Sequence, residues 1–74
     1  MNPERPLDAL NEARNKRIII ELKNGRQLLG KLKAFDIHIN IVIDDVEERI
    51  NGEMTRKLGT VFIRGDTITV ISTE

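Results

Sequence analysis

Most of the side chains in this chain that could take part in binding or catalysis lie in two short polar segments, each set between apolar stretches. One segment contains His38 and Asn40, and the other is Arg64-Gly65-Asp66. Together they supply an imidazole, a primary amide, a guanidinium and a carboxylate. Two flat groups can hold a nucleobase between them, while an amide hydrogen-bonds the edge of the base. We therefore expect the two segments to meet and form a slot for a base.

The amide of Asn40 decides which base the slot would accept. It can donate and accept at once, which matches the O4 and N3–H edge of uracil. The same amide, turned over, fits cytosine, so selectivity requires a neighbour that fixes it. We expect ionised Asp66 to hold the amide NH2, and Asp36 to make a local turn hydrogen bond. Each of these residues taken alone is equally compatible with a structural role, and that alternative stays open.

Catalysis has little support in the residue types. The chain has no cysteine, one histidine and one late serine, Ser72, so a nucleophile with its base is missing. Asp44 and Asp45 are adjacent on an expected strand and point to opposite faces. A small hydrolase using Asp36 and His38 is a weaker alternative. We expect no enzyme activity, no metal site and no cofactor.

The size and the charge favour self-association. A chain of 74 residues has a small core, and without disulfides or zinc it needs another source of stability. The 12 basic and 12 acidic residues cancel, unlike the charge of most nonspecific nucleic-acid binders. Basic residues gather between Arg14 and Lys33, and acidic ones between Asp44 and Glu53. These are either solvated surfaces or faces that dock copies or a phosphate backbone.

The elements that must position the polar segments are mostly β. A short helix is expected over residues 6–14, with Pro6 at its first position. Strands are expected over residues 17–22, from 27 through a bend at Gly30, 39–48, 54–63 and 67–72. Asn24-Gly25 predicts a hairpin, and Arg64-Gly65-Asp66 predicts a tight turn in which the glycine is free to take a positive φ.

Five short antiparallel strands behind one helix predict a small, strongly bent barrel. The hairpin of residues 58–63 and 67–71 forms an edge without charge or proline, which invites pairing with another copy. No apolar run is long enough to span a membrane, and the first residues lack the apolar stretch of a signal peptide. We expect a soluble, cytoplasmic protein.

With these residues in view, the chain resembles the Sm and Sm-like (LSm) proteins, especially the archaeal type. The first Sm motif, about residues 17–48, is represented by Asn24-Gly25-Arg26, Gly30 and the run from Phe35 to Asp44. The second, about residues 57–72, is represented by the run from Leu58 to Ile68. The resemblance covers nearly the whole chain and implies one Sm-like domain over residues 1–74.

The resemblance implies an SH3-like Sm fold that closes into a ring, most often of seven copies, through the fourth and fifth strands. It also implies a homo-oligomer that binds uridine-rich single-stranded RNA at the central pore and acts as an RNA chaperone or scaffold in RNA processing. His38 and Arg64 would stack on the base, Asn40 would read its edge, and Gly65 and Asp66 would complete the pocket. Ile39 departs from the methionine common there. The alternative is a structural or protein-interaction ring without specific RNA binding.

Overall fold

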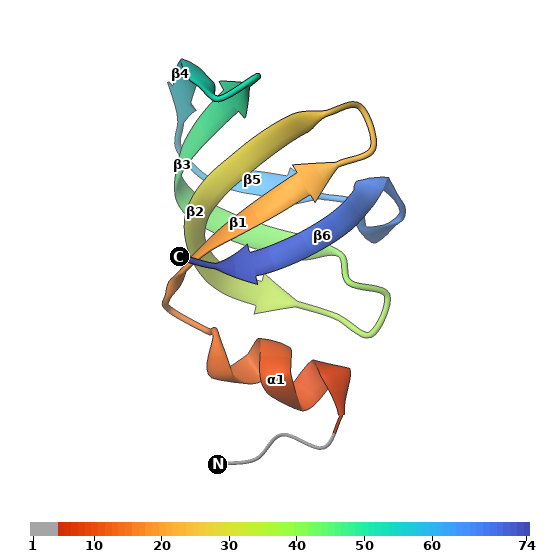
Figure 1. Cartoon of the computed structure of the whole chain (residues 1–74). Coiled ribbons are helices and arrows are strands. Elements are labelled where there is room, and N and C mark those ends of the chain that lie inside the picture. Colours follow the sequence, from red (N-terminus) through yellow and green to blue (C-terminus); the bar gives the residue numbers. More distant parts are fainter. Residues whose placement is uncertain (1–4) are drawn as a thin grey trace.

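The computed structural model describes residues 5–74 (Figure 1), and the first four residues of the predicted domain lie outside that range. One helix precedes six strands. Their bounds are α1 Pro6–Glu12, β1 Arg17–Leu22, β2 Arg26–Phe35, β3 Ile41–Ile50, β4 Glu53–Leu58, β5 Val61–Ile63 and β6 Ile68–Thr73. A 3₁₀ turn, Gly65–Thr67, connects β5 to β6. The predicted mostly β fold, with a short helix before a bent antiparallel sheet, is confirmed.

Helix α1 begins as the sequence predicts and ends two residues earlier. Pro6 occupies its first turn with Asp8, and Asn15, with φ 66°, ends the turn that follows. So short a helix needs tertiary contacts. Ala13 is buried in the barrel core, and the Arg14 guanidinium lies 5.2 Å from the ring centre of Phe35. These contacts hold the helix against the barrel.

The sheet bends because β3 serves two partners. The strand order is β4-β3-β2-β1-β6, and β5 also pairs with β3. The first half of β3 pairs with β5, from Ile41 opposite Ile63, and the second half with β4, from Val46 opposite Leu58. The expected fourth strand is therefore two strands, separated at residues 59–60. Between the two halves, Asp45 has φ 54°, which turns β3 sharply.

Gly30 lies opposite this turn and allows it. The register of β2 against β3 shifts between Leu29 and Lys31. A Cβ at Gly30 would lie 2.9 Å from the Asp44 carbonyl oxygen and 3.1 Å from Val46 Cγ2. A side chain does not fit in that space, so the predicted bend at Gly30 is confirmed.

The core is aliphatic and draws on the helix and most strands. Its buried members are Ala13, Ile18, Ile20, Leu28, Leu32, Ile41, Ile43, Val46 and Ile63. Four large apolar side chains of the described residues are exposed: Ile37, Met54, Phe62 and Val70. Two of them lie on β5 and β6, where Phe62 is 78% and Val70 49% exposed. Within residues 5–74, β5 pairs only with β3 and β6 only with β1. No helix in this part of the chain has the length and apolar character to cross a membrane.

Candidate nucleic-acid interface

The five predicted site residues line one depression of about 460 Å³: His38, Asn40, Arg64, Gly65 and Asp66. They come from the β2–β3 loop and from the segment between β5 and β6. Ile41 of β3 pairs with Phe35 of β2 on one side and Ile63 of β5 on the other. Both polar segments therefore leave the sheet at the same end, on the right of Figure 1. The structure brings the residues together; their role toward RNA stays a prediction.

Asp36 organises the β2–β3 loop. Its Oδ1 accepts hydrogen bonds from the backbone N–H groups of His38, at 2.8 Å, and Asn40, at 3.1 Å. Its main-chain oxygen accepts from the N–H of Ile39 at 3.0 Å. The local turn role predicted for Asp36 is confirmed. One carboxylate thus orders the whole loop between the two strands.

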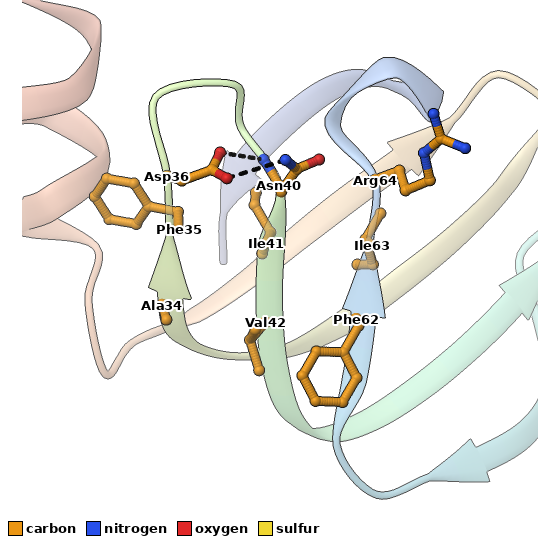
Figure 2. A pocket seen from close by; sticks show the side chains of 9 residues that line it. All are labelled: Ala34, Phe35, Asp36, Asn40, Ile41, Val42, Phe62, Ile63 and Arg64. Carbon is orange, nitrogen blue, oxygen red and sulfur yellow. Dashed lines mark hydrogen bonds between the residues drawn. The ribbon is translucent and has the colours of Figure 1, made fainter.

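Asp36 also fixes the amide of Asn40, the task we expected of Asp66. The Nδ2 of Asn40 donates to Asp36 Oδ2 at 3.0 Å, and its Oδ1 accepts from the N–H of Gly65 at 2.9 Å. Figure 2 shows the two contacts between Asp36 and Asn40. The expectation for Asp66 is wrong because its carboxylate pairs with Arg64, at 3.1 Å. The amide keeps one N–H and one oxygen lone pair for a ligand.

The charge of Asp36 makes this amide orientation unambiguous. The hydrogen bond from the Asn40 side chain has the largest effect and lowers the pKa of Asp36. Burial, the next largest effect, opposes it, and backbone hydrogen bonds from Asn40 and His38 lower the pKa further. An ionised carboxylate only accepts hydrogen bonds. The NH2 of Asn40 must therefore face Asp36, and its oxygen must face Gly65.

The second segment leaves its guanidinium available for stacking. Arg64 and Asp66 form an ion pair with each other, and their side chains are 82% and 63% exposed. An ion pair this exposed contributes little to stability. The Thr67 hydroxyl donates to the Arg64 carbonyl at 2.7 Å and closes the 3₁₀ turn. The Arg64 side chain is therefore oriented by Asp66 and remains accessible to a ligand.

Gly65 is required for a reason other than the one expected. It is absent from the glycines with positive φ, which are Gly25 and Gly52 in the described chain. A Cβ at Gly65 would instead collide with the carbonyl oxygen of His38 and lie 2.8 Å from the carbonyl carbon of Ile39. The predicted tight turn is a 3₁₀ turn, so the freedom of glycine to take a positive φ is not used here. Glycine at position 65 permits the backbones of the two polar segments to touch.

Ile39 is a feature that sequence reasoning missed. Its φ is 60°, a left-handed conformation that is unfavourable for a β-branched residue. Two contacts hold it there: its N–H donates to the Asp36 carbonyl, and its half-buried side chain packs against the core. The unusual backbone lies between His38 and Asn40 and sets their relative directions.

Two further depressions adjoin the pocket at Arg64. One, of about 370 Å³, includes Lys23, Asn24 and Thr67, and its wall is held by a hydrogen bond from Lys23 N–H to the Thr67 carbonyl, 2.8 Å. The other, of about 400 Å³, is an apolar groove beside Asn40 that contains Val42 and Phe62 (Figure 2). Sequence reasoning assigned no role to Lys23, which the chain order places far from Arg64.

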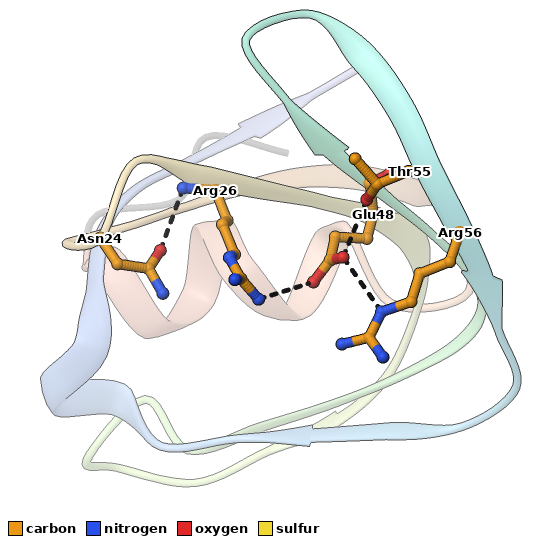
Figure 3. A network of polar contacts seen from close by, with 5 residues as sticks. All are labelled: Asn24, Arg26, Glu48, Thr55 and Arg56. Atoms are coloured by element: carbon orange, nitrogen blue, oxygen red, sulfur yellow. Dashed lines mark hydrogen bonds and ion pairs between the residues drawn. The ribbon is translucent and has the colours of Figure 1, made fainter.

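A second polar cluster lies at the other end of β3 (Figure 3). Glu48 is 6% exposed and accepts hydrogen bonds from Thr55 Oγ1, Arg56 Nε and Arg26 Nη1 at 2.8, 3.0 and 3.4 Å. The Arg56 contact, followed by that of Thr55, lowers the pKa of Glu48. The cluster ties β2, β3 and β4 together. Across residues 5–74, no group of three or more potential metal ligands gathers.

Comparison with known proteins gives consistent results. The model of the LSM domain family matches residues 8–73. A snRNP Sm-like protein of Archaeoglobus fulgidus is 50% identical over 70 residues, which cover 95% of this chain and 91% of that protein. The chain is also similar to two solved structures. The Pyrococcus abyssii Sm protein, solved in complex with a uridine heptamer, has a TM-score of 0.92 at 38% identity, covering 96% of this chain and 100% of that one. The P. aerophilum SmAP1 heptamer has a TM-score of 0.88 at 30% identity, covering 93% and 92%.

Proposed function

The chain belongs to the LSM domain family, and from this we propose that it forms a ring that binds uridine-rich single-stranded RNA. The ring would act as an RNA chaperone or scaffold in RNA processing. LSM-domain proteins are a non-enzymatic, RNA-binding family. We extend that description to this protein, with RNA bound and released unchanged.

The observation that carries the proposal is the restrained amide of Asn40. With Asp36 on its nitrogen and the Gly65 N–H on its oxygen, the amide offers one donor beside one acceptor. Uracil presents the complementary pair, the O4 acceptor beside the N3–H donor. Cytosine presents the pair in reverse order, so a base held in the same orientation would meet donor with donor. A fixed amide in a shaped slot therefore favours uracil.

Stacking supplies the affinity. His38 and Arg64 are exposed and line the same depression as Asn40. A base that enters between them has one face toward an imidazole and the other toward a guanidinium, and such stacking contributes about 1–3 kcal/mol per base. Since the chain carries no net charge, we expect binding that depends only weakly on salt.

Ring formation accounts for the exposed apolar residues of β5 and β6. Phe62 and Val70 are on β5 and β6, the strands that flank the Gly65–Thr67 turn. If β5 of one copy pairs with β6 of the next, both side chains become covered and both strand edges are satisfied. Each copy then contributes one base pocket beside the pore, and a run of uridines fills successive pockets. A heptamer is our proposed copy number.

Titration of oligouridine and oligocytidine against the protein and two variants tests the proposal. We expect uridine-selective binding that Arg64→Ala weakens strongly and Lys31→Ala, an exposed cation outside the pocket, weakens much less. Native mass spectrometry of the same samples should give one ring size for all three proteins. An intact ring without uridine selectivity, or with equal losses in both variants, would instead support a protein-interaction ring. A cytoplasmic location remains part of the proposal, and the absence of cysteine from the chain fits a reducing compartment.

A further inference from the structure

The chain contains two Asn-Gly pairs, and the structure treats them differently. Asn24-Gly25 lies between β1 and β2, and Asn51-Gly52 lies between β3 and β4. All four residues are exposed. Asparagine is chemically labile, and a following glycine leaves its own nitrogen unshielded because it has no side chain. By sequence alone, the two pairs have equal reactivity.

Asn24 is restrained at both reacting groups. Its Oδ1 accepts the backbone N–H of Arg26 at 3.0 Å (Figure 3). The nitrogen of Gly25 donates to the carbonyl of Leu22, also at 3.0 Å. Attack of that nitrogen on the Asn24 side chain would break its hydrogen bond to Leu22, and the bond from Arg26 restrains the side-chain rotation that the attack requires. The turn therefore protects the asparagine that borders the Arg64 depression.

Asn51 has neither restraint. Among residues 5–74, no hydrogen bond involves its side-chain amide, and the Gly52 nitrogen makes no backbone hydrogen bond outside the strand ladder. Both residues have positive φ, 53° and 82°, as in a two-residue hairpin turn. The adjoining β4 is exposed over residues 53–57, so little packing opposes movement of the turn.

We propose that Asn51 is a site of spontaneous deamidation and that Asn24 is protected from it. The Gly52 nitrogen gives up its proton to solvent base and attacks Cγ of Asn51. A nitrogen–carbon bond forms, the bond from Cγ to the amide nitrogen breaks, and ammonia leaves. Water then opens the cyclic imide at either carbonyl, giving aspartate or isoaspartate at position 51. No oxidant, metal or enzyme is needed.

The products alter the hairpin and leave the base pocket unchanged. Both place a carboxylate two residues before Glu53, and isoaspartate also adds a carbon to the backbone of a two-residue turn. That extra atom opposes the pairing of Ile50 with Glu53, which closes the hairpin. The turn is at the top of Figure 1, away from the pocket loops on the right. Deamidation would therefore alter the end of the barrel that carries the β3–β4 turn and leave the pocket end unchanged.

Incubation of the full-length folded protein in neutral buffer, followed by site-resolved peptide mapping with mass spectrometry, tests the inference. We expect the mass change of deamidation in the peptide containing Asn51, with the peptide containing Asn24 several-fold slower. In intact-mass measurements, Asn51→Gln should lose most of the ageing and Asn24→Gln should retain it. Incubation in denaturant supplies the matched control, in which the two sites should react at similar rates because both precede glycine.

Each result decides the matter without reference to RNA. Similar rates at the two sites in the folded protein, or faster reaction at Asn24, would overturn the inference. So would a rate difference that persists in the unfolded chain, because sequence rather than structure would then be its cause. The wild-type peptide map is sufficient even if a glutamine variant folds poorly.

Discussion

The Asp36 carboxylate holds the Asn40 residue at two points, accepting from its side-chain Nδ2 at 3.0 Å and from its backbone N–H at 3.1 Å. The first contact orients the amide and the second orients the chain that carries it. Because the Asn40 side-chain oxygen also accepts from the Gly65 N–H, Asp36 and Asn40 together link the two polar segments. Under the proposed function, base selectivity would depend on Asp36, a residue that need not touch the base.

Replacing Asp36 should reduce selectivity more than it reduces assembly. In Asp36→Asn, the partner of the Asn40 NH2 is no longer an obligate acceptor, so only the Gly65 N–H still fixes the orientation of the amide. We expect oligouridine affinity to fall roughly five- to tenfold and the preference for uridine over cytidine to narrow. Fluorescence anisotropy with both oligonucleotides measures this. Asp66→Asn is the matched control, since Asp66 pairs only with Arg64 among the described residues; an equal loss of preference there would contradict the assignment.

The same carboxylate predicts the acid limit of binding. The pKa of Asp36 is lower in the folded protein than its ordinary value of 3.8. A group with a depressed pKa contributes fully above its unfolded value and loses that contribution as the pH falls through the folded value. Uridine affinity should therefore hold as the pH approaches 3.8 and decline only below it. The pKa of Glu48 is also lowered, so the difference between wild type and Asp36→Asn isolates the part of the acid-induced loss of affinity that is due to Asp36. A decline in affinity that begins near neutral pH would refute the prediction.

The close approach at Gly65 predicts a strong effect for one added methyl group. In Gly65→Ala, the Cβ collides with the His38–Ile39 peptide and separates the two segments. We expect a loss of about 1–3 kcal/mol in the free energy of unfolding and loss of uridine binding. Gly59→Ala serves as the control, because a Cβ there meets no atom within 4 Å. Urea denaturation and titration of both variants decide the point; equal stabilities would show that the segments can part at no cost.

The backbone of Ile39 predicts a stabilising substitution. Ile39→Met keeps an apolar side chain against the core and removes the branching that makes φ 60° unfavourable. We expect the free energy of unfolding to rise by about 0.5–1 kcal/mol, with uridine affinity unchanged. Thermal unfolding measures the first and anisotropy the second. A destabilised Ile39→Met variant would indicate that the shape of isoleucine, rather than its apolar character, holds the loop.

Much of the fold follows from local patterns in the sequence. The β-branched run from Arg17 to Leu22, the glycine at position 30 and the Asn-Gly turns each specify their structure without help from distant residues. The division of the fourth strand does not, because Gly59 and Thr60 interrupt it only where β3 has already turned at Asp45. Burial of Glu48 likewise depends on Arg26 and Arg56, which come from two other strands.

The candidate site, like the fold, was only partly predictable from the sequence. Residue types, together with the resemblance to Sm-like proteins, were enough to select the five residues that line the pocket. They were not enough to choose between Asp36 and Asp66 as the partner of Asn40, since both lie near it in any converging arrangement. Distances decide that choice, and they depend on how the loop closes. The same holds for the contact between Gly65 and the His38–Ile39 peptide, which only the folded chain brings together.

That backbone contact has a thermodynamic consequence. Gly65 lies against the peptide between His38 and Ile39, which stops the segments from moving closer, and its N–H donates to the Asn40 amide oxygen, which opposes their separation. The width of the slot is therefore set before any nucleotide arrives. Association then requires little ordering of the protein, and the entropic penalty falls mainly on the flexible RNA strand. Calorimetry with oligouridines of increasing length should therefore show an unfavourable entropy that grows with each nucleotide captured, rather than one large cost for the first.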